Sequence, residues 1–162
     1  TVFDSDRLHP SELTVGWTPP SGDGCQGHNF EVACTGLPRA RWHRLERRSI
    51  ENYIPQAVLQ NVNPTATSTL FGASVGLMAR FFNMKRGLRG DGVSPPNPNK
   101  VIRATRCRGF WSSLPAAEVT SLESGFGTDV SDEFRNVPSA HAWPEDVLHE
   151  MDALAEALQD AI

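Results

Sequence analysis

Apolar residues recur at helical spacing in several parts of this chain. The longest such pattern runs from about residue 68 to 86, where Leu, Phe and Met side chains fall on one side and Gly87 provides a stop. Residues 116–123 and a stretch that starts near Pro144 predict two further helices, and residues 25–36 predict a shorter one. Loops rich in Gly, Pro and Asn separate these stretches.

Two short strands are predicted in the first third of the chain. Val2-Phe3 is an apolar pair directly before Asp4-Ser5-Asp6, and residues 41–45 alternate in the manner of a strand. Ser49 is a good helix cap, and Glu51 falls in the first helical turn, where the helix dipole favours an acid. The pattern therefore places three carboxylates close to the ends of two strands.

Carboxylates at strand ends are the means by which α/β folds collect oxygen ligands for Mg²⁺ or Mn²⁺. Residues two apart in a strand point to the same side, so Asp4 and Asp6 can reach one ion. The sequence therefore predicts an α/β fold with a metal site at this pair. The alternative is a strand that ends in a turn with two aspartate caps.

The net charge of −4 on 162 residues conceals a strong asymmetry along the chain. Thirteen Lys and Arg against three acids give residues 39–108 a charge of +10, whereas residues 1–38 carry −4 and residues 109–162 carry −10. A basic centre made mostly of arginine favours contact with a polyphosphate such as DNA. The alternative is that this basic face pairs with the acidic tail within the same fold.

Three cysteines, Cys25, Cys34 and Cys107, are an odd number without a CxxC pair. This usage is typical of a reducing compartment, so a cytoplasmic location is expected. No apolar run approaches the length that spans a membrane, so no membrane partner is expected.

Two motifs in combination resemble the carboxy-terminal part of Toprim domains: FDSD at residues 3–6 and RRSIENY at residues 47–53. The resemblance is greatest to the Toprim domains of OLD-type (overcoming lysogenisation defect) nucleases and related ATPase-linked proteins. Residues 83–88 and 125–127 are similar to the same group, so the resemblance covers roughly residues 1–130.

This resemblance implies a fold and an activity. The implied fold is a Toprim-like partial parallel sheet flanked by helices, with a helical carboxy-terminal extension. Residues 1–66 would form the core with the DxD motif and the IENY helix, and residues 67–162 the helical continuation and extension. The implied activity is that of a Mg²⁺- or Mn²⁺-dependent endonuclease that hydrolyses DNA, in anti-phage defence or DNA processing.

The resemblance also implies roles for individual residues. Asp4, Asp6 and Glu51 would be the metal ligands, and Lys85 would be the cation near the scissile phosphate. These four residues form the expected catalytic set, although a lysine near a helix end also has a purely electrostatic explanation. Contacts with nucleic acid are expected from Arg44, Arg47, Arg48, Lys85 and Arg86.

The chain departs from the Toprim pattern in two respects. It begins just before the DxD motif, so the glutamate that Toprim domains carry on an earlier strand has no counterpart, and a preceding segment is expected. It also contains no Gly-x-x-x-x-Gly-Lys-Ser/Thr loop, so an ATPase region is expected on the same or another chain. A homo-oligomer is a further expectation.

Two other classes of function fit part of the pattern. In a nucleotide-sugar transferase, an Asp-x-Asp motif after an apolar strand holds Mn²⁺ on a diphosphate, but this class leaves Glu51 and the arginines without a role. In a non-catalytic binding module, the basic centre holds nucleic acid and the acids are structural. A serine hydrolase is not supported, because no Gly-x-Ser-x-Gly motif is present.

Overall fold

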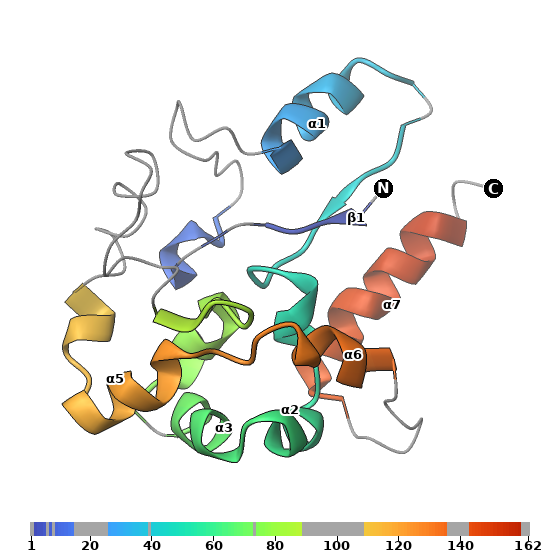
Figure 1. Cartoon of the computed structure of the whole chain (residues 1–162). Helices are drawn as coiled ribbons and strands as arrows, with labels where there is room; N and C mark the ends of the chain where they lie inside the picture. Colours follow the sequence, from blue (N-terminus) through green and yellow to red (C-terminus); the bar gives the residue numbers. More distant parts are fainter. Residues whose placement is uncertain are drawn as a thin grey trace.

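The structure of the chain is a computed structural model, which describes residues 2–5, 7, 9–14, 26–38, 40–72, 74–88, 109–135 and 143–159. Of these residues, 62% are helical and 3% lie in strands. None of the described helices is both long enough and apolar enough to cross a membrane. The described part of the chain is therefore a helical structure with very little strand (Figure 1).

Within these ranges the elements are short. The strands are β1 (Val2–Phe3) and β2 (His43–Arg44). The α-helices are α1 (Gln26–Thr35), α2 (Gln56–Val62), α3 (Pro64–Leu70), α5 (Ala116–Glu123), α6 (Asp129–Arg135) and α7 (Glu145–Gln159). Three 3-10 helices, η1 (Pro10–Glu12), η2 (Ile50–Tyr53) and η3 (Gly76–Phe81), connect them. The helices predicted at residues 25–36, at residues 116–123 and from Pro144 are confirmed as α1, α5 and α7.

The predicted α/β fold is wrong, because the described residues do not form a Toprim-like parallel sheet. β1 and β2 pair in parallel, with Val2 opposite His43 and Phe3 opposite Arg44, and this pair of two-residue strands is all the strand they contain. Soon after β2 the chain turns into η2, which Ser49 caps as predicted. The apolar positions that follow recur at helical spacing and pack helices on helices, so they supply no further strand.

The long helix predicted over residues 68–86 is also wrong. The α-helix α3 ends at Leu70, and a separate 3-10 helix, η3, begins at Gly76. Gly76, the first residue of η3, has a φ of +51°, in the left-handed region that glycine adopts readily and that does not continue an α-helix. The apolar residues do recur at helical spacing, but they are divided between α3, which ends at Leu70, and the separate 3-10 helix η3.

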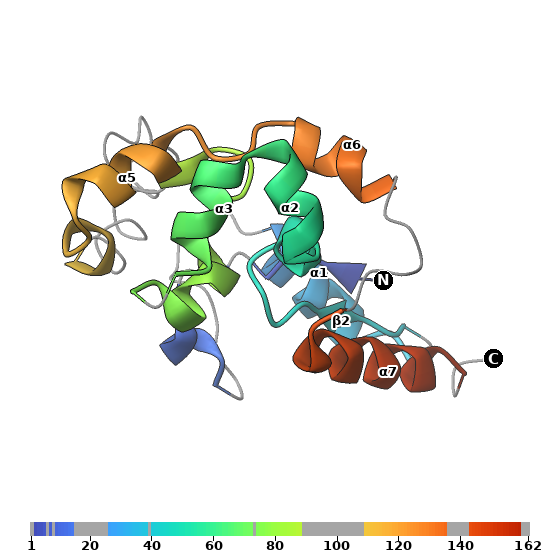
Figure 2. The same ribbon diagram turned by 90° about the horizontal axis from the view of Figure 1, so that it is seen from below.

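The larger hydrophobic core lies between the central helices. α2 packs beside α3, α5 packs against α3, and α6 packs against α2 (Figures 1 and 2). The buried side chains of this core run from Ile54 to Val130, and Leu59, Leu70, Phe82 and Leu122 are fully buried within it. The core contains residues on both sides of residue 66, while the predicted domain division at that point stays a prediction.

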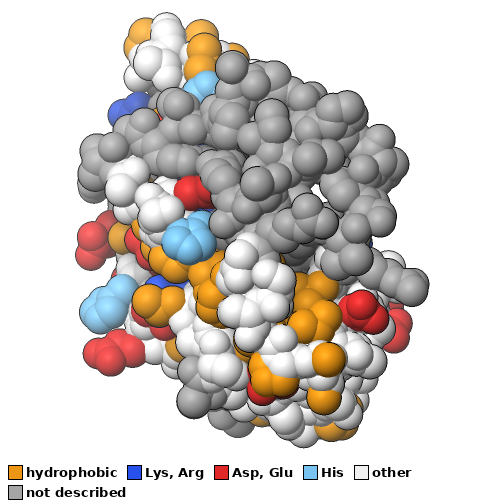
Figure 3. All heavy atoms as spheres, turned by 90° about the vertical axis from the view of Figure 1, so that its left-hand side faces the viewer, with side chains coloured by type: hydrophobic (Ala, Val, Ile, Leu, Met, Phe, Trp, Pro, Cys, Tyr) orange, Lys and Arg blue, Asp and Glu red, His pale blue; other side chains and the backbone are white. Residues whose placement is uncertain are grey.

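A second, smaller core joins α7 to the segment after β2. Leu45, Tyr53 and Val147 are buried together, and Trp143 and Met151 pack against them. The side of the molecule that carries α5 shows hydrophobic side chains at its lower surface (Figure 3). The smaller core sets the course of the chain between β2 and η2.

Two glycines allow a close approach of two turns. Phe126 N donates to Met84 O at 2.7 Å, and this brings Gly125 against Gly87. Gly87 and Gly125 both have positive φ, of +58° and +60°. Residues 83–88 and 125–127 therefore lie against each other, and their contact positions the turn that contains Lys85.

We predict that Gly87→Ala destabilises the fold severely. A Cβ atom at this position would lie 2.1 Å from Leu122 O and 2.6 Å from Gly125 N, in addition to the strain of positive φ. Gly127→Ala is the matched control, because Gly127 has a φ of +63° but open space around it. The control should lose about 1–2 kcal/mol of unfolding free energy, and Gly87→Ala clearly more, as measured by urea denaturation. Equal losses would contradict the close approach of the two turns.

Candidate functional site

The parallel pairing of β1 with β2 brings two distant segments to one place. Beyond the strands, Ser5 Oγ donates to Arg47 O at 2.7 Å, and Ser5 is almost completely buried. Asp4 Oδ1 accepts from Ile50 N at 3.0 Å, so the carboxylate of Asp4 lies at the start of η2. Because parallel strands end at the same edge, the end of β1 and the start of η2 meet there.

Glu51 lies in the first turn of η2, as predicted, and is buried. Its Oε1 atom is 2.6 Å from Lys85 Nζ, whose side chain is 52% exposed. Burial acts to raise the pKa of Glu51, but hydrogen bonds from Lys85 and Ser49 together with the charge of Lys85 outweigh it, so the pKa lies below its ordinary value. The pKa of Lys85 is raised, first by Glu51 and in smaller part by the charge of Asp4.

Three of the four predicted catalytic residues, Asp4, Glu51 and Lys85, are therefore gathered around one point. The fourth, Asp6, lies outside the described residues. The described part of the chain contains no group of three His, Cys, Asp or Glu residues that could hold a metal ion. It does supply two carboxylates of the type that Mg²⁺ and Mn²⁺ prefer, and the Lys85 ammonium group on Glu51 marks a position that favours positive charge.

The predicted nucleic-acid contacts have different surroundings. The side chain of Arg44 is only 7% exposed and forms an ion pair with Glu31 of α1. Arg48 Nη1 donates to Phe81 O at 3.4 Å, and Arg86 is exposed on the turn that carries Lys85. Of the predicted basic set, Lys85 and Arg86 are the most exposed, so the structure does not gather all five cations on one open surface.

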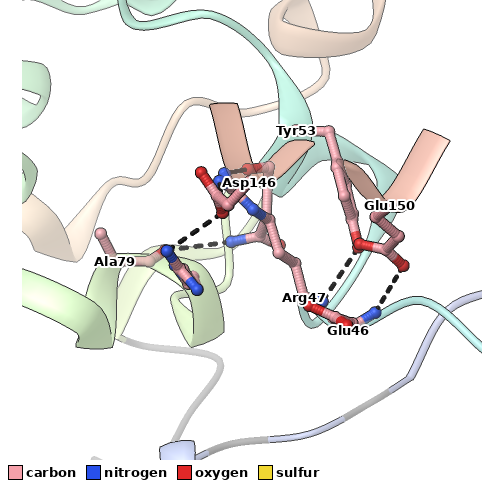
Figure 4. Close-up of polar contacts among 8 residues, drawn as sticks. Glu46, Arg47, Tyr53, Ala79, Asp146 and Glu150 are labelled. Carbon is pink, nitrogen blue, oxygen red and sulfur yellow. Dashed lines mark hydrogen bonds and ion pairs between the residues drawn. The ribbon is translucent and has the colours of Figure 1, made fainter. Parts of the chain in front are cut away.

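Arg47 lies in a polar network that also includes Glu150 of α7 (Figure 4). Glu150 is buried, and its Oε1 accepts from Glu46 N at 2.9 Å and lies 2.8 Å from His43 Nε2. Its Oε2 accepts a short hydrogen bond from the Tyr53 hydroxyl, which in turn accepts from Arg47 N at 3.0 Å. Burial, followed by Glu150, raises the pKa of Tyr53, so this hydroxyl stays protonated as a donor.

The side chain of Arg47 meets a second acid of α7. Arg47 Nη2 donates to Asp146 Oδ2 at 2.7 Å, and Arg80 Nη2 lies 3.0 Å from the same oxygen. Arg47 Nη1 donates to Asn52 O at 2.5 Å, and its guanidinium carbon lies 5.1 Å from the centre of the Tyr53 ring. This contact is the pairing of basic centre and acidic tail that the charge pattern left open as an alternative.

Sequence reasoning did not identify Arg80, Asp146 or Glu150 as parts of this arrangement. A signal for the two acids was present, because Asp146 and Glu150 are four residues apart and so lie on the face of α7 that also buries Val147. Their specific partners, Arg47 and Tyr53, are nearly a hundred residues away, and no local pattern indicates such a pairing.

No protein-family model, curated protein or solved structure matches this chain.

We predict that the stability contributed by Glu51 is lost in acid. A carboxyl group whose pKa is lower in the folded chain stabilises the fold above its unfolded pKa of about 4.3, and this contribution disappears as the pH falls through the folded value. The unfolding free energies of the wild type and Glu51→Gln, measured by urea denaturation, should therefore differ above about pH 5. They should converge as the pH falls through the pKa of Glu51 in the folded chain. Lys85→Met should weaken this pH dependence, because Lys85 lowers the pKa of Glu51. A difference that does not change with pH would contradict the ion pair.

We predict that Tyr53→Phe costs about 1–3 kcal/mol of unfolding free energy, although it keeps the aromatic ring. The change removes the hydroxyl that accepts from Arg47 N and donates to Glu150, and leaves both groups buried without it. Thr120→Ala is the control, because its exposed hydroxyl bonds only within α5, and it should change stability by less than about 0.5 kcal/mol. A cost for Tyr53→Phe no larger than for the control would show that the hydroxyl does not hold the network together.

Proposed function

We propose that this chain contributes the metal-binding site of a Mg²⁺- or Mn²⁺-dependent enzyme that hydrolyses phosphodiester bonds in DNA. The observation that supports it is the meeting of Asp4, Glu51 and Lys85, which come from three separate segments of the chain. Two acids and a lysine at one edge of the strand pair are the residue types that metal-assisted phosphodiester hydrolysis uses. The proposal depends on these residues and not on a Toprim fold.

The residues would divide the work as follows. Asp4 and Glu51 would hold the metal through carboxylate oxygens, and Asp6 is proposed as a third ligand on the DxD motif alone. The metal would supply a Lewis acid that activates water and stabilises the leaving oxygen. Lys85, released from Glu51 when the metal binds, would place its ammonium group near the phosphate and offset the charge that develops there. An ATPase partner and a role in anti-phage defence belong to the same proposal through the resemblance to OLD-type proteins.

A second candidate function, a non-catalytic nucleic-acid-binding module, is supported by a specific observation. Asp4 accepts a backbone hydrogen bond at the start of η2, and Glu51 is neutralised by Lys85, so both acids also have structural roles. In that case the acids would contribute to stability and the cations alone would contact DNA. The two functions differ in whether the acids are needed for cleavage.

We predict Mn²⁺-dependent cleavage of supercoiled plasmid by the complete native protein, with any partner ATPase present. Asp4→Asn and Glu51→Gln should each lower the cleavage rate by at least about a hundredfold, because each removes a charged ligand while it keeps the shape of the side chain. Lys85→Met should lower the cleavage rate roughly a hundredfold, because it removes one group that stabilises charge in the transition state. Glu46→Gln, at an exposed position nearby, is the control and should cut like the wild type.

The variants are to be compared only where circular dichroism and thermal unfolding show that they fold. Cleavage by the wild type that persists unchanged in Asp4→Asn and Glu51→Gln would place the active site elsewhere. DNA binding without cleavage in every variant would reject the catalytic proposal and leave the binding module.

A further inference from the structure

Two arginines converge on a single carboxylate oxygen beside a cavity. Arg47 and Arg80 are 2.7 and 3.0 Å from Asp146 Oδ2, and both arginines line a cavity of about 240 Å³. Two guanidinium groups that converge on one oxygen form an arrangement suited to an oxyanion, phosphate included. In this structure the oxyanion is the protein's own acid.

The three side chains differ in exposure, and the difference favours replacement of the Asp146 carboxylate by another anion. Arg47 is held in place, with 11% of its side chain exposed and a second hydrogen bond to Asn52 O, while Arg80 is 30% exposed. Asp146 is the most exposed of the three, at 38%. α7 is fixed by the burial of Val147 and Glu150, so Asp146 can release the arginines by a change of side-chain rotamer while the helix stays docked.

The cavity suits one part of a larger ligand. Pockets that hold whole drug-sized ligands span about 300–1,000 Å³, so this one is smaller. Its wall includes Phe71 and Leu77, two exposed apolar side chains, together with Pro144 at the start of α7. A phosphate on the arginines would place an attached sugar or base against this apolar wall, as in single-stranded nucleic-acid sites.

We propose that Arg47 and Arg80 form a phosphate-binding subsite for a nucleic-acid strand, and that Asp146 occupies this subsite until a phosphate displaces it. The nature of the ligand rests on the proposed function, whereas the arginine pair and its acid are features of the described structure. The acidic end of the chain thus lowers the affinity for DNA at a defined position. Binding of a phosphodiester moves the Asp146 carboxylate to solvent and transfers its two arginine partners to a phosphate oxygen.

We predict that Asp146→Asn binds a single-stranded oligonucleotide roughly fivefold more tightly than the wild type, because removal of one negative charge close to a phosphate is worth about 1 kcal/mol near water. For this variant, the slope of log Kd against the logarithm of the salt concentration should be steeper by about one. Glu145→Gln is the matched control. It removes the same charge at the neighbouring position, where the side chain of Glu145 is 91% exposed. Binding is measured by fluorescence anisotropy in EDTA, so that no cleavage occurs.

The double variant Asp146→Asn/Arg80→Gln should lose the gained affinity and the added salt dependence. In the wild-type background, Arg80→Gln should also weaken binding, which tests the subsite without Asp146→Asn if that variant does not fold. Affinity for Asp146→Asn equal to that of Glu145→Gln, or an Arg80→Gln variant that binds like the wild type, would overturn the proposal.

A parallel titration with inorganic phosphate identifies the source of the oxyanion. Competition by millimolar phosphate with no gain in oligonucleotide affinity would overturn the nucleic-acid subsite in favour of a free-phosphate site. The outcome is independent of catalysis. Metal-dependent cleavage without an effect of Asp146→Asn would reject this subsite alone, whereas tighter binding by Asp146→Asn without cleavage would reject the nuclease and keep the subsite.

Discussion

The segment from β2 to η2 depends for its position on the buried carboxyl group of Glu150 in α7. Burial of such a group costs several kcal/mol unless hydrogen bonds compensate for the lost water. The Glu46 N–H and the Tyr53 hydroxyl donate to it, and His43 Nε2 lies within hydrogen-bonding distance. All three partners come from β2, the following turn and η2, so this one carboxyl group fixes the course of that segment against α7. Few other conformations of the segment would satisfy the same group.

Arg47 carries this constraint to the candidate site. Its N–H donates to the Tyr53 hydroxyl, which is already held by α7, and its carbonyl oxygen accepts from Ser5 directly after β1. The end of β1 is thereby fixed against the start of η2, where Asp4 accepts from Ile50 N. The position of the acids at the edge of the strand pair therefore depends on a hydrogen-bond network behind it, and the variant Tyr53→Phe acts on the site through this path.

Local signals predicted the local structure around the candidate site better than they predicted the fold. The strand at Val2-Phe3, the cap at Ser49 and the acid at Glu51 each follow from a few neighbouring residues, and the structure has them where the sequence places them. The sheet was not predicted correctly, because strand pairing depends on partners distant in sequence, which two short apolar segments do not specify. The left-handed conformation of Gly76 and the pairing of Arg47 with α7 are likewise tertiary outcomes that no spacing indicates.

The two proposed sites share one physical logic. In each, the less exposed charged group is paired with a more exposed partner of opposite sign: Glu51 with Lys85, and Arg47 with Asp146. Replacement of the exposed partner by a ligand of the same charge keeps the less exposed group paired, whereas that group left alone would carry a desolvation cost without compensation. A cation at Glu51 and a phosphate at Arg47 would each substitute for the exposed member and keep the less exposed one neutralised. The acidic and basic segments of this chain therefore stabilise the unliganded fold with the same groups that they would offer to ligands. A metal cation would bind the acid Glu51, and a phosphate would bind the base Arg47.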